Sequence, residues 1–396
     1  MSQDQKAVDY EWIHLSYTEV NRFAETYGFN GTQGTVHLEG ILLRPQDRPS
    51  KTLLIMMHPS STLHLLPVPT AFAKAGLHVL CGGSRYPKND TALIMEKVIL
   101  DLGAYVRHAK EVWGYERVVL LGWSGGGALS MFYQSQAEHP TITETPAGDP
   151  VDIAGAELIP ADAVIFQSAH AGRALNLAEI IDPSVLDEND PDRRDVALDM
   201  YDPRNPNQPP YSAEYVARYR EAQKARIRRI TAWVKATLAD LKARGGKEME
   251  RGFVVHRTWA DLRFRDPALD PNDRKPGSSA LGDPEPVNSG PIGLARFSTL
   301  RSWLSQWSLD DSRADGYKCA ATMKAPLLVI EGSADDGVPQ PDSGGIYAAA
   351  ASSDKTFHVI KEATHYYANQ PDQIAEAVST VTQWLRARDL LEGAVA

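Results

Sequence analysis

The run Gly122-Trp123-Ser124-Gly125-Gly126-Gly127 is the segment whose residue types and spacing point most directly to chemistry. It comes directly after a predicted strand and directly before a predicted helix. A serine on such a sharp turn holds its hydroxyl clear of the backbone, and small residues on either side let the chain turn that tightly. The pattern predicts that Ser124 is a nucleophile. The simpler alternative is a glycine-rich turn that only packs a helix against a strand.

A serine hydroxyl needs a neighbouring base, and that base needs an acid to orient it. Among the eleven histidines, His365 lies in a loop between a predicted strand and the last predicted helix. Asp335 follows another predicted strand, and its neighbour Asp336 is the second choice for the acid. We therefore expect Ser124, Asp335 and His365 to form a catalytic triad. The simpler alternatives are a surface histidine and a turn-capping aspartate.

The elements that must position these residues are short apolar strands that alternate with amphipathic helices. Such an alternation indicates a mainly parallel sheet covered by helices on both faces. Parallel strands end at one edge of a sheet, so the three residues are expected at that edge. The predicted strands are residues 52–57, 77–81, 117–121, 163–167, 326–331 and 355–360, with 35–43 as an antiparallel edge strand. The predicted helices are residues 68–75, 91–113, 128–138 and one that begins at 371.

The alternation stops over residues 171–324, which contain a long predicted helix at 212–244 and a Pro- and Asp-rich stretch. Residues 294–307 are apolar and aromatic and are predicted to be helical. We interpret 171–324 as a mostly helical lid or cap domain inserted into a core of residues 1–170 and 325–396. A second packed domain is the alternative interpretation.

The order of Ser124, Asp335 and His365 along the chain resembles that of the α/β-hydrolase-fold serine hydrolases. Gly332-x-x-Asp335-x-x-Val338-Pro339 resembles the acid loop of that superfamily. The resemblance covers about residues 35–170 and 325–390 and identifies no subfamily. It implies an esterase- or lactonase-like enzyme that cleaves a carboxylic ester or lactone through an acyl-enzyme. The alternatives are an amidase or carbon–carbon bond hydrolase with the same triad and, in another class, a ligand-binding receptor or pseudoenzyme.

The resemblance also implies an oxyanion hole built from the backbone N–H of Gly125 and one N–H of the loop after residue 57. That loop reads His58-Pro59-Ser60-Ser61, where the superfamily usually has His-Gly. Proline has no N–H to donate, so Ser60 is the expected second donor. Ser61 or a side-chain hydroxyl is the alternative, and His58 is interpreted as a structural loop histidine.

Further candidates could contact a small-molecule substrate. The predicted lid contains five aromatic residues that could bind a bulky apolar group of the substrate: Trp233, Trp259, Phe297, Trp303 and Trp307. They could equally form the core of the lid. The complete set of candidate substrate contacts is Ser61, His64, Trp123, His170, Trp303, Trp307 and Tyr366.

The composition excludes several other classes of function. The net charge of −10 argues against nucleic acid or an anionic membrane surface as the partner. No apolar run approaches the roughly 18 residues of a membrane span, and two cysteines make no disulfide framework, so we expect a cytoplasmic protein. No metal-binding, Walker or dinucleotide motif is present, which predicts no metal and no cofactor. The sequence indicates no oligomeric state.

Overall fold

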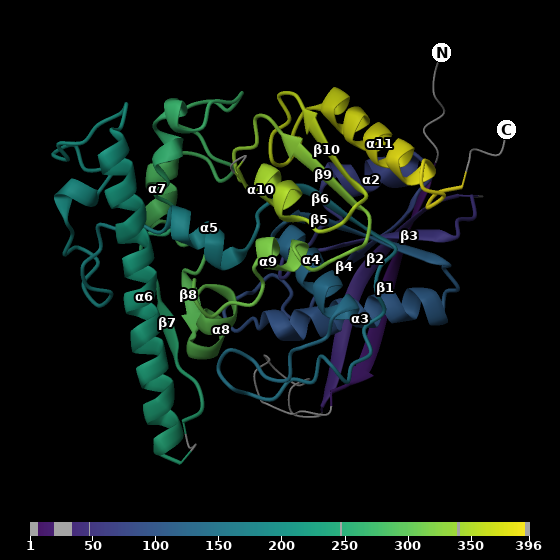
Figure 1. Ribbon diagram of the computed structural model, residues 1–396, viewed down its shortest axis with the longest axis horizontal. Helices are drawn as coiled ribbons and strands as arrows, with labels where there is room; N and C mark the ends of the chain where they lie inside the picture. Colours follow the sequence, from purple (N-terminus) through teal and green to yellow (C-terminus); the bar gives the residue numbers. More distant parts are fainter. Residues whose placement is uncertain (1–6, 20–33, 47, 246–247, 339–340, 393–396) are drawn as a thin grey trace.

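The computed structural model describes residues 7–19, 34–46, 48–245, 248–338 and 341–392, and its main element is an eight-stranded sheet in the order β1-β2-β4-β3-β5-β6-β9-β10 (Figure 1). β1 and β2 pair antiparallel, β2 pairs antiparallel with β4, and all other neighbours are parallel. The strands are β1 (Val8–Thr18), β2 (Thr35–Pro45), β3 (Thr52–Met57), β4 (His78–Gly82), β5 (Arg117–Ser124), β6 (Ala163–Ala169), β9 (Leu327–Gly332) and β10 (Lys355–Ile360).

The antiparallel side of the sheet contains one strand more than the sequence predicted. β2 is antiparallel as expected, but it is not the edge, because β1 pairs with it along its whole length. β1 buries Ile13 and Leu15 on one face and exposes Tyr10 and Trp12 on the other. This half-buried alternation is typical of an outer strand of an antiparallel pair.

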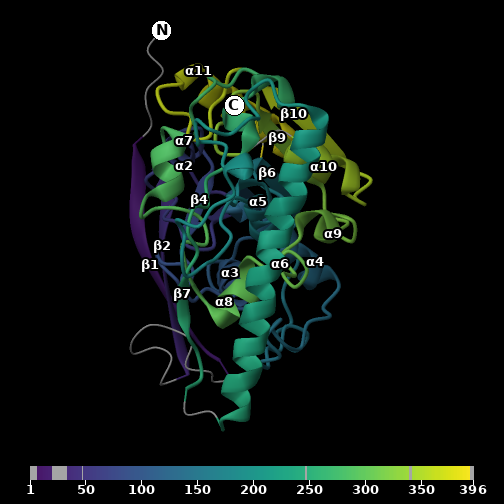
Figure 2. The ribbon, with the colours of Figure 1, turned by 90° about the vertical axis from the view of Figure 1, so that its left-hand side faces the viewer.

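Helices cover both faces of the parallel strands, and alternate side chains of each strand enter two separate cores. Leu54 and Met56 of β3 pack with α2 and α11 on one face. Leu53 and Ile55 pack with α3 and α4 on the other face, as the period of two in a strand requires. Figures 1 and 2 show these two helical layers around the sheet. The helices are α2 (Pro67–Lys74), α3 (Met95–Glu111), α4 (Gly125–Glu138), α9 (Gly316–Ala320), α10 (Pro341–Ala349) and α11 (Pro371–Arg386).

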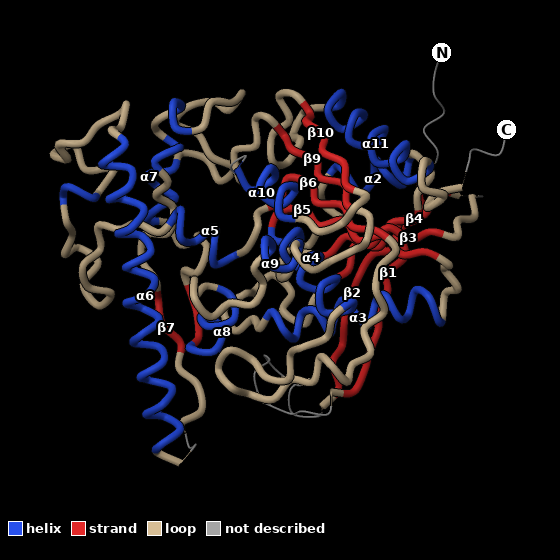
Figure 3. The backbone as a smooth tube through the Cα atoms, viewed as in Figure 1, coloured by secondary structure: helices blue, strands red, loops and turns tan. Residues whose placement is uncertain are grey.

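Between β6 and β9 the chain forms an insertion of helices and long loops that stands beside the sheet (Figure 3). Its longest helix begins after Ser212, whose hydroxyl accepts the N–H of Tyr215 and caps the first turn. Its elements are α5 (Arg173–Ile180), α6 (Ala213–Ala243), β7 (Gly252–Val254), α7 (Pro284–Ser289), β8 (Phe297–Thr299), α8 (Leu300–Gln306) and the 3₁₀ turns Val196–Leu198, Leu262–Phe264 and Pro267–Leu269.

The insertion has an apolar core of its own, in which Ile227, Ile230 and Val234 of α6 pack against Trp303 and Trp307. The expectation of a continuous helix over 294–307 is wrong in part, since β8 pairs antiparallel with β7 before α8 begins. The last segment of the range predicted as a lid packs elsewhere. Cys319 and Ala320 of α9 belong to the core beneath the sheet, beside α4.

Candidate active site

Ser124 stands on a strained turn at the junction of β5 and α4. Its backbone has φ 54° and ψ −125°, a conformation that L-residues rarely adopt and that is found at functional sites. Two glycines beside this turn are required, because a side chain at either position would collide with the backbone. A Cβ on Gly122 would lie 2.3 Å from the carbonyl oxygen of Gly126, and a Cβ on Gly126 would lie 2.4 Å from that of Met57. The glycine pattern therefore allows the tight turn that raises Ser124 above the end of the sheet.

His365 and Asp335 meet at the same edge, on the loops after β10 and β9. The Nδ1 of His365 lies 3.0 Å from Oδ1 and 3.2 Å from Oδ2 of Asp335, and both side chains are buried. Asp335 Oδ1 also accepts the backbone N–H groups of Gly337 and Val338, at 2.9 and 2.8 Å. These bonds fix the carboxylate and turn Nε2 of His365, the other ring nitrogen, away from it.

The ring of His365 is held on its remaining sides by aromatic residues. The indole N–H of Trp123 donates to the backbone oxygen of His365 at 3.0 Å, and the two rings are 4.6 Å apart between centroids. Tyr366 lies edge-on to the same imidazole at 5.0 Å. The imidazole therefore has little freedom to rotate away from Asp335.

Asp336, the second choice for the acid, does not reach the ring. Its Oδ1 accepts the backbone N–H of His365 at 3.4 Å. Burial and the neighbouring Asp335 raise the pKa of the Asp336 carboxyl above its usual value. Of the two acids, Asp335 is the one hydrogen-bonded to the imidazole.

Ser124 and His365 line one cavity of about 210 Å³ between the sheet edge and the insertion. Among the predicted contacts, Ser61, Trp123, His170, Trp307 and Tyr366 line it together with His58 and Ser60. A larger cavity, of about 400 Å³, lies between β1 and α3 and contains none of the predicted site residues. The insertion supplies further lining residues: Arg173, Asn176, Trp259, Ala280, Leu281, Leu294 and Trp307.

The structure does not bring every predicted contact to this cavity. Trp303 is fully buried in the insertion core, where its indole N–H donates to Thr231 at 2.9 Å. His64 lies outside the cavity lining on a partly exposed turn. Trp233 and Phe297 are largely exposed, so only Trp259 and Trp307 of the five lid aromatics line the cavity.

Arg173 is a cavity residue that the sequence reasoning missed. Its guanidinium is buried, pairs with Asp90 and lies over the ring of Trp307, with 4.4 Å between the guanidinium carbon and the ring centroid. Burial lowers the pKa of Arg173. Burial also lowers the pKa of His170, to about 3, and Arg173 and His365 contribute to this shift. The sequence places His170 at the sheet edge, and Arg173 follows it by only three residues. This short spacing could have identified Arg173 as a cavity residue.

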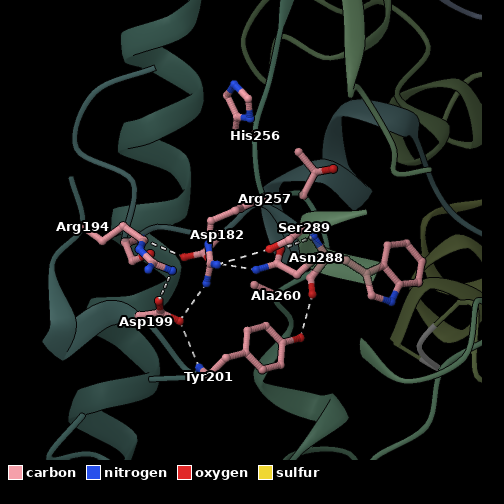
Figure 4. Close-up of polar contacts among 12 residues, drawn as sticks. Asp182, Arg194, Asp199, Tyr201, His256, Arg257, Ala260, Asn288 and Ser289 are labelled. Atoms are coloured by element: carbon pink, nitrogen blue, oxygen red, sulfur yellow. Dashed lines mark hydrogen bonds and ion pairs between the residues drawn. The ribbon is translucent and has the colours of Figure 1, made fainter. Parts of the chain in front are cut away.

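A polar network inside the insertion fixes the loop that carries Trp259. Arg257 bridges Asp182 and Asp199, with nitrogen–oxygen distances of 2.6 and 2.9 Å (Figure 4). Asn288 donates to Asp182 and accepts the backbone N–H of Trp259, each at 2.9 Å. The wall of the cavity on this side is therefore tied to a buried ion-pair network.

The two backbone N–H groups predicted for the oxyanion hole, those of Gly125 and Ser60, differ in their hydrogen bonding. Gly125 opens α4, so its backbone N–H has no partner within the helix. The N–H groups of Ser60 and Ser61 instead point to Nδ1 of His58, at 3.1 and 2.9 Å. The structure thus does not present the Ser60 N–H to the cavity as the sequence led us to expect.

The strand order, the antiparallel β2 and the serine turn after β5 define the α/β-hydrolase fold. Solved structures with a similar fold include DcsB in complex with its substrate analogue, at 11% identity and a TM-score of 0.52, with 96% of this chain and 99% of that chain covered. Weaker likenesses are found to a monoacylglycerol lipase of Paleococcus ferrophilus, at 14% identity and a TM-score of 0.41, with 95% of this chain and 98% of that chain covered. An esterase of Pyrococcus furiosus is 15% identical, with a TM-score of 0.44 and with 96% of this chain and 91% of that chain covered.

At these identities the likeness concerns the fold alone. No protein-family model matches the sequence, and no curated protein matches it. No helix within the described part of the chain is long and apolar enough to cross a membrane. The same residues contain no group of three or more His, Cys, Asp or Glu side chains placed to hold a metal ion.

Proposed function

We propose that this protein is a serine hydrolase that cleaves a carboxylic ester or lactone through an acyl-enzyme. The observation that carries the proposal is that His365, paired with the buried Asp335, lines the same cavity as Ser124 on its strained turn. A pair of this kind activates a serine for attack on a carbonyl.

In the proposed mechanism, Nε2 of His365 takes the proton of Ser124 as the hydroxyl oxygen attacks the carbonyl carbon. Asp335 holds the imidazole in the tautomer that carries its proton on Nδ1, and stabilises the imidazolium that forms. The backbone N–H of Gly125 stabilises the developing oxyanion. His365 then protonates the leaving alcohol, and a water molecule releases the acyl group by the same route.

We further propose that residues 171–324 act as a cap over this site. The insertion contacts the acid loop directly, since the N–H of Ala280 donates to the carbonyl of Asp336 and that of Asp273 to Ser333. Its residues Trp307 and Leu281 line the cavity. Caps of this kind set substrate choice by shape and by exclusion of water.

Covalent labelling tests the proposed nucleophile. A fluorophosphonate should label the protein with one adduct, located at Ser124 by peptide mass spectrometry. Labelling should be absent in Ser124→Ala and unaffected in Ser379→Ala, a matched change on the exposed face of α11. A ligand-binding receptor on this fold would leave Ser124 unlabelled in the wild-type protein, and that result contradicts the proposal.

The cap proposal predicts that a larger side chain at Leu281 changes substrate ranking. Leu281 is 38% exposed at the cavity, so Leu281→Trp can narrow the cavity without disturbing a packed core. We expect KM for esters with a bulky acyl group to rise about tenfold or more, since one mismatched group in a pocket is worth about 1–3 kcal/mol. The KM for an acetate ester should change little.

The matched control is Leu186→Trp, at an exposed leucine of the insertion outside the cavity lining. It should leave the ratio of kcat/KM for bulky and small esters unchanged. Equal ratios in the wild type, Leu281→Trp and Leu186→Trp would show that this part of the insertion does not shape the substrate site.

A further inference from the structure

We propose that the Nε2–H of His58 is the second donor of the oxyanion hole, in place of a backbone N–H from the loop after β3. The inference rests on the proposed function, because an oxyanion forms only if Ser124 attacks a carbonyl. It reverses the sequence-based interpretation of His58 as a structural loop residue.

The hydrogen bonds of His58 determine where its proton lies. Two backbone N–H groups, those of Ser60 and Ser61, point to Nδ1 at 3.1 and 2.9 Å. Both are donors, so Nδ1 must accept and cannot carry a proton. A neutral imidazole has one proton, which therefore lies on Nε2 and makes this atom a hydrogen-bond donor.

The surroundings keep this ring neutral. Burial lowers the pKa of His58 well below its usual value, and the positive charge of Arg173 lowers it further. Asp90, which also lines the cavity, is paired with Arg173. A neutral imidazole with a depressed pKa can polarise a carbonyl oxygen without acting as a base.

The Nε2 atom also lies where an oxyanion donor is required. A Cβ built on Gly125 would be only 2.7 Å from Nε2 of His58, so the ring nitrogen lies against the residue that follows Ser124. His58 and Ser124 line the same cavity. Nε2 makes no hydrogen bond with any residue in the described ranges, which leaves it free to bind a substrate oxygen.

The loop that carries His58 is held rigidly in this conformation. The carbonyl of Ser60 accepts the N–H of Lys88 at 2.7 Å, and the carbonyl of Pro59 accepts the hydroxyl of Ser84. Pro59 has no N–H, and the next two N–H groups point to the imidazole. The ring thus takes over a role that this backbone does not fill, and its fixed position lowers the cost of reorganisation during the reaction.

The Ser124 oxygen bonds to the carbonyl carbon, the π pair of the carbonyl moves onto its oxygen, and the serine proton moves to Nε2 of His365. His58 keeps its proton and donates a hydrogen bond to the new oxyanion, beside the Gly125 N–H. When the tetrahedral intermediate collapses, the carbonyl re-forms, the bond from the carbonyl carbon to the alcohol oxygen breaks, and that oxygen takes the proton from His365.

Two substitutions separate the donor role of His58 from its structural role. In His58→Asn the side-chain oxygen can still accept the N–H groups of Ser60 and Ser61, but nothing replaces Nε2–H. In His58→Gln the longer amide can return an N–H group to that position. We expect His58→Asn to lower kcat about 10²–10³-fold with little change in KM, since the bond forms only in the transition state. His58→Gln should recover at least tenfold of that loss, and the control His139→Asn, at the exposed end of α4, should match the wild type.

The rate of fluorophosphonate labelling at Ser124 is measured for the same variants, because the phosphoryl oxygen occupies the oxyanion site. Suppose that the wild type is labelled, and that the labelling rate and kcat of His58→Asn are both within threefold of the wild-type values. His58 is then not the donor, and the proposed function stands. If Ser124 of the wild type is not labelled, the proposed function fails and this inference with it.

The tautomer can be checked without any substrate. In ¹⁵N-histidine-labelled protein, the resonances lost in His58→Asn should be those of a neutral ring protonated at Nε2, unchanged from pH 5 to pH 8. In the phosphonylated protein the Nε2–H proton should move downfield. An Nδ1–H tautomer or an imidazolium at pH 6 would overturn the inference, whatever the activity.

Discussion

Replacing Ser124 or His365 by alanine is expected to lower kcat for ester hydrolysis by roughly 10⁶-fold. Ser124 supplies the attacking oxygen in the proposed mechanism, and His365 is the base that removes its proton. The two act as a unit, so the double variant should be little slower than either single variant. The residual rate should come from substrate binding and the oxyanion donors alone.

This result is measured by steady-state kinetics with each variant confirmed as folded by its thermal unfolding curve. Ser379→Ala and His139→Ala serve as controls, because both side chains are exposed and neither lines the cavity. Losses that add in the double variant would mean that the two residues act independently, and the assignment of a triad would be wrong.

Replacing Asp335 by asparagine is expected to lower kcat by about 10⁴-fold through the tautomer of His365. The side-chain oxygen of asparagine would stay with the N–H groups of Gly337 and Val338, which now bond to Asp335 Oδ1. The amide NH₂ would then face Nδ1 of His365 as a donor. The imidazole would have to carry its proton on Nε2, where it cannot accept the proton of Ser124.

Asp336→Asn is the matched control for this prediction. Its carboxylate accepts the backbone N–H of His365, at 3.4 Å, and makes no hydrogen bond with the ring of that residue. We expect its kcat to stay within tenfold of the wild type. If Asp336→Asn were the slower variant, the acid would be Asp336 and the acid loop would adopt a different conformation during the reaction.

Local patterns in the sequence predicted most of the parallel sheet. A continuous apolar run such as Thr52–Met57 can be buried only between two helical layers, and the structure contains a strand there. The pattern also predicted that Ser124, Asp335 and His365 follow different strands at one sheet edge. That prediction needs no knowledge of distances, because parallel strands place their ends together.

Strand β1 escaped this reasoning because its pattern is weaker. The segment buries only Ile13 and Leu15, and its exposed face carries the aromatic residues Tyr10 and Trp12, so apolar and polar residues do not alternate clearly. Without β1, β2 takes the edge position by default. Whether a segment with so weak an alternation forms a strand depends on the neighbouring strand that it pairs with, here β2, and not on its own periodicity.

For the two lid tryptophans at the end of α8, the sequence predicted burial but not the direction in which each ring points. Trp303 and Trp307 lie four residues apart at one helix end, and both are fully buried. Both pack in the insertion core, but of the two only Trp307 also lines the cavity, where Arg173 lies over its ring. Burial follows from their apolar character, but the direction each ring faces depends on how the insertion docks on the sheet.

The sequence by itself determined the parallel α/β sheet and the order of the candidate catalytic residues, because strand periodicity and the glycine turn are local properties. Only the tertiary structure decided which acid meets His365 and which group of the His58 loop faces the cavity. Asp335 and Asp336 are adjacent in the chain, and the choice between them depends on side-chain direction. The His58 ring accepts the N–H groups of its own loop through Nδ1, but the approach of its Nε2 to Gly125 depends on how that loop packs against the start of α4.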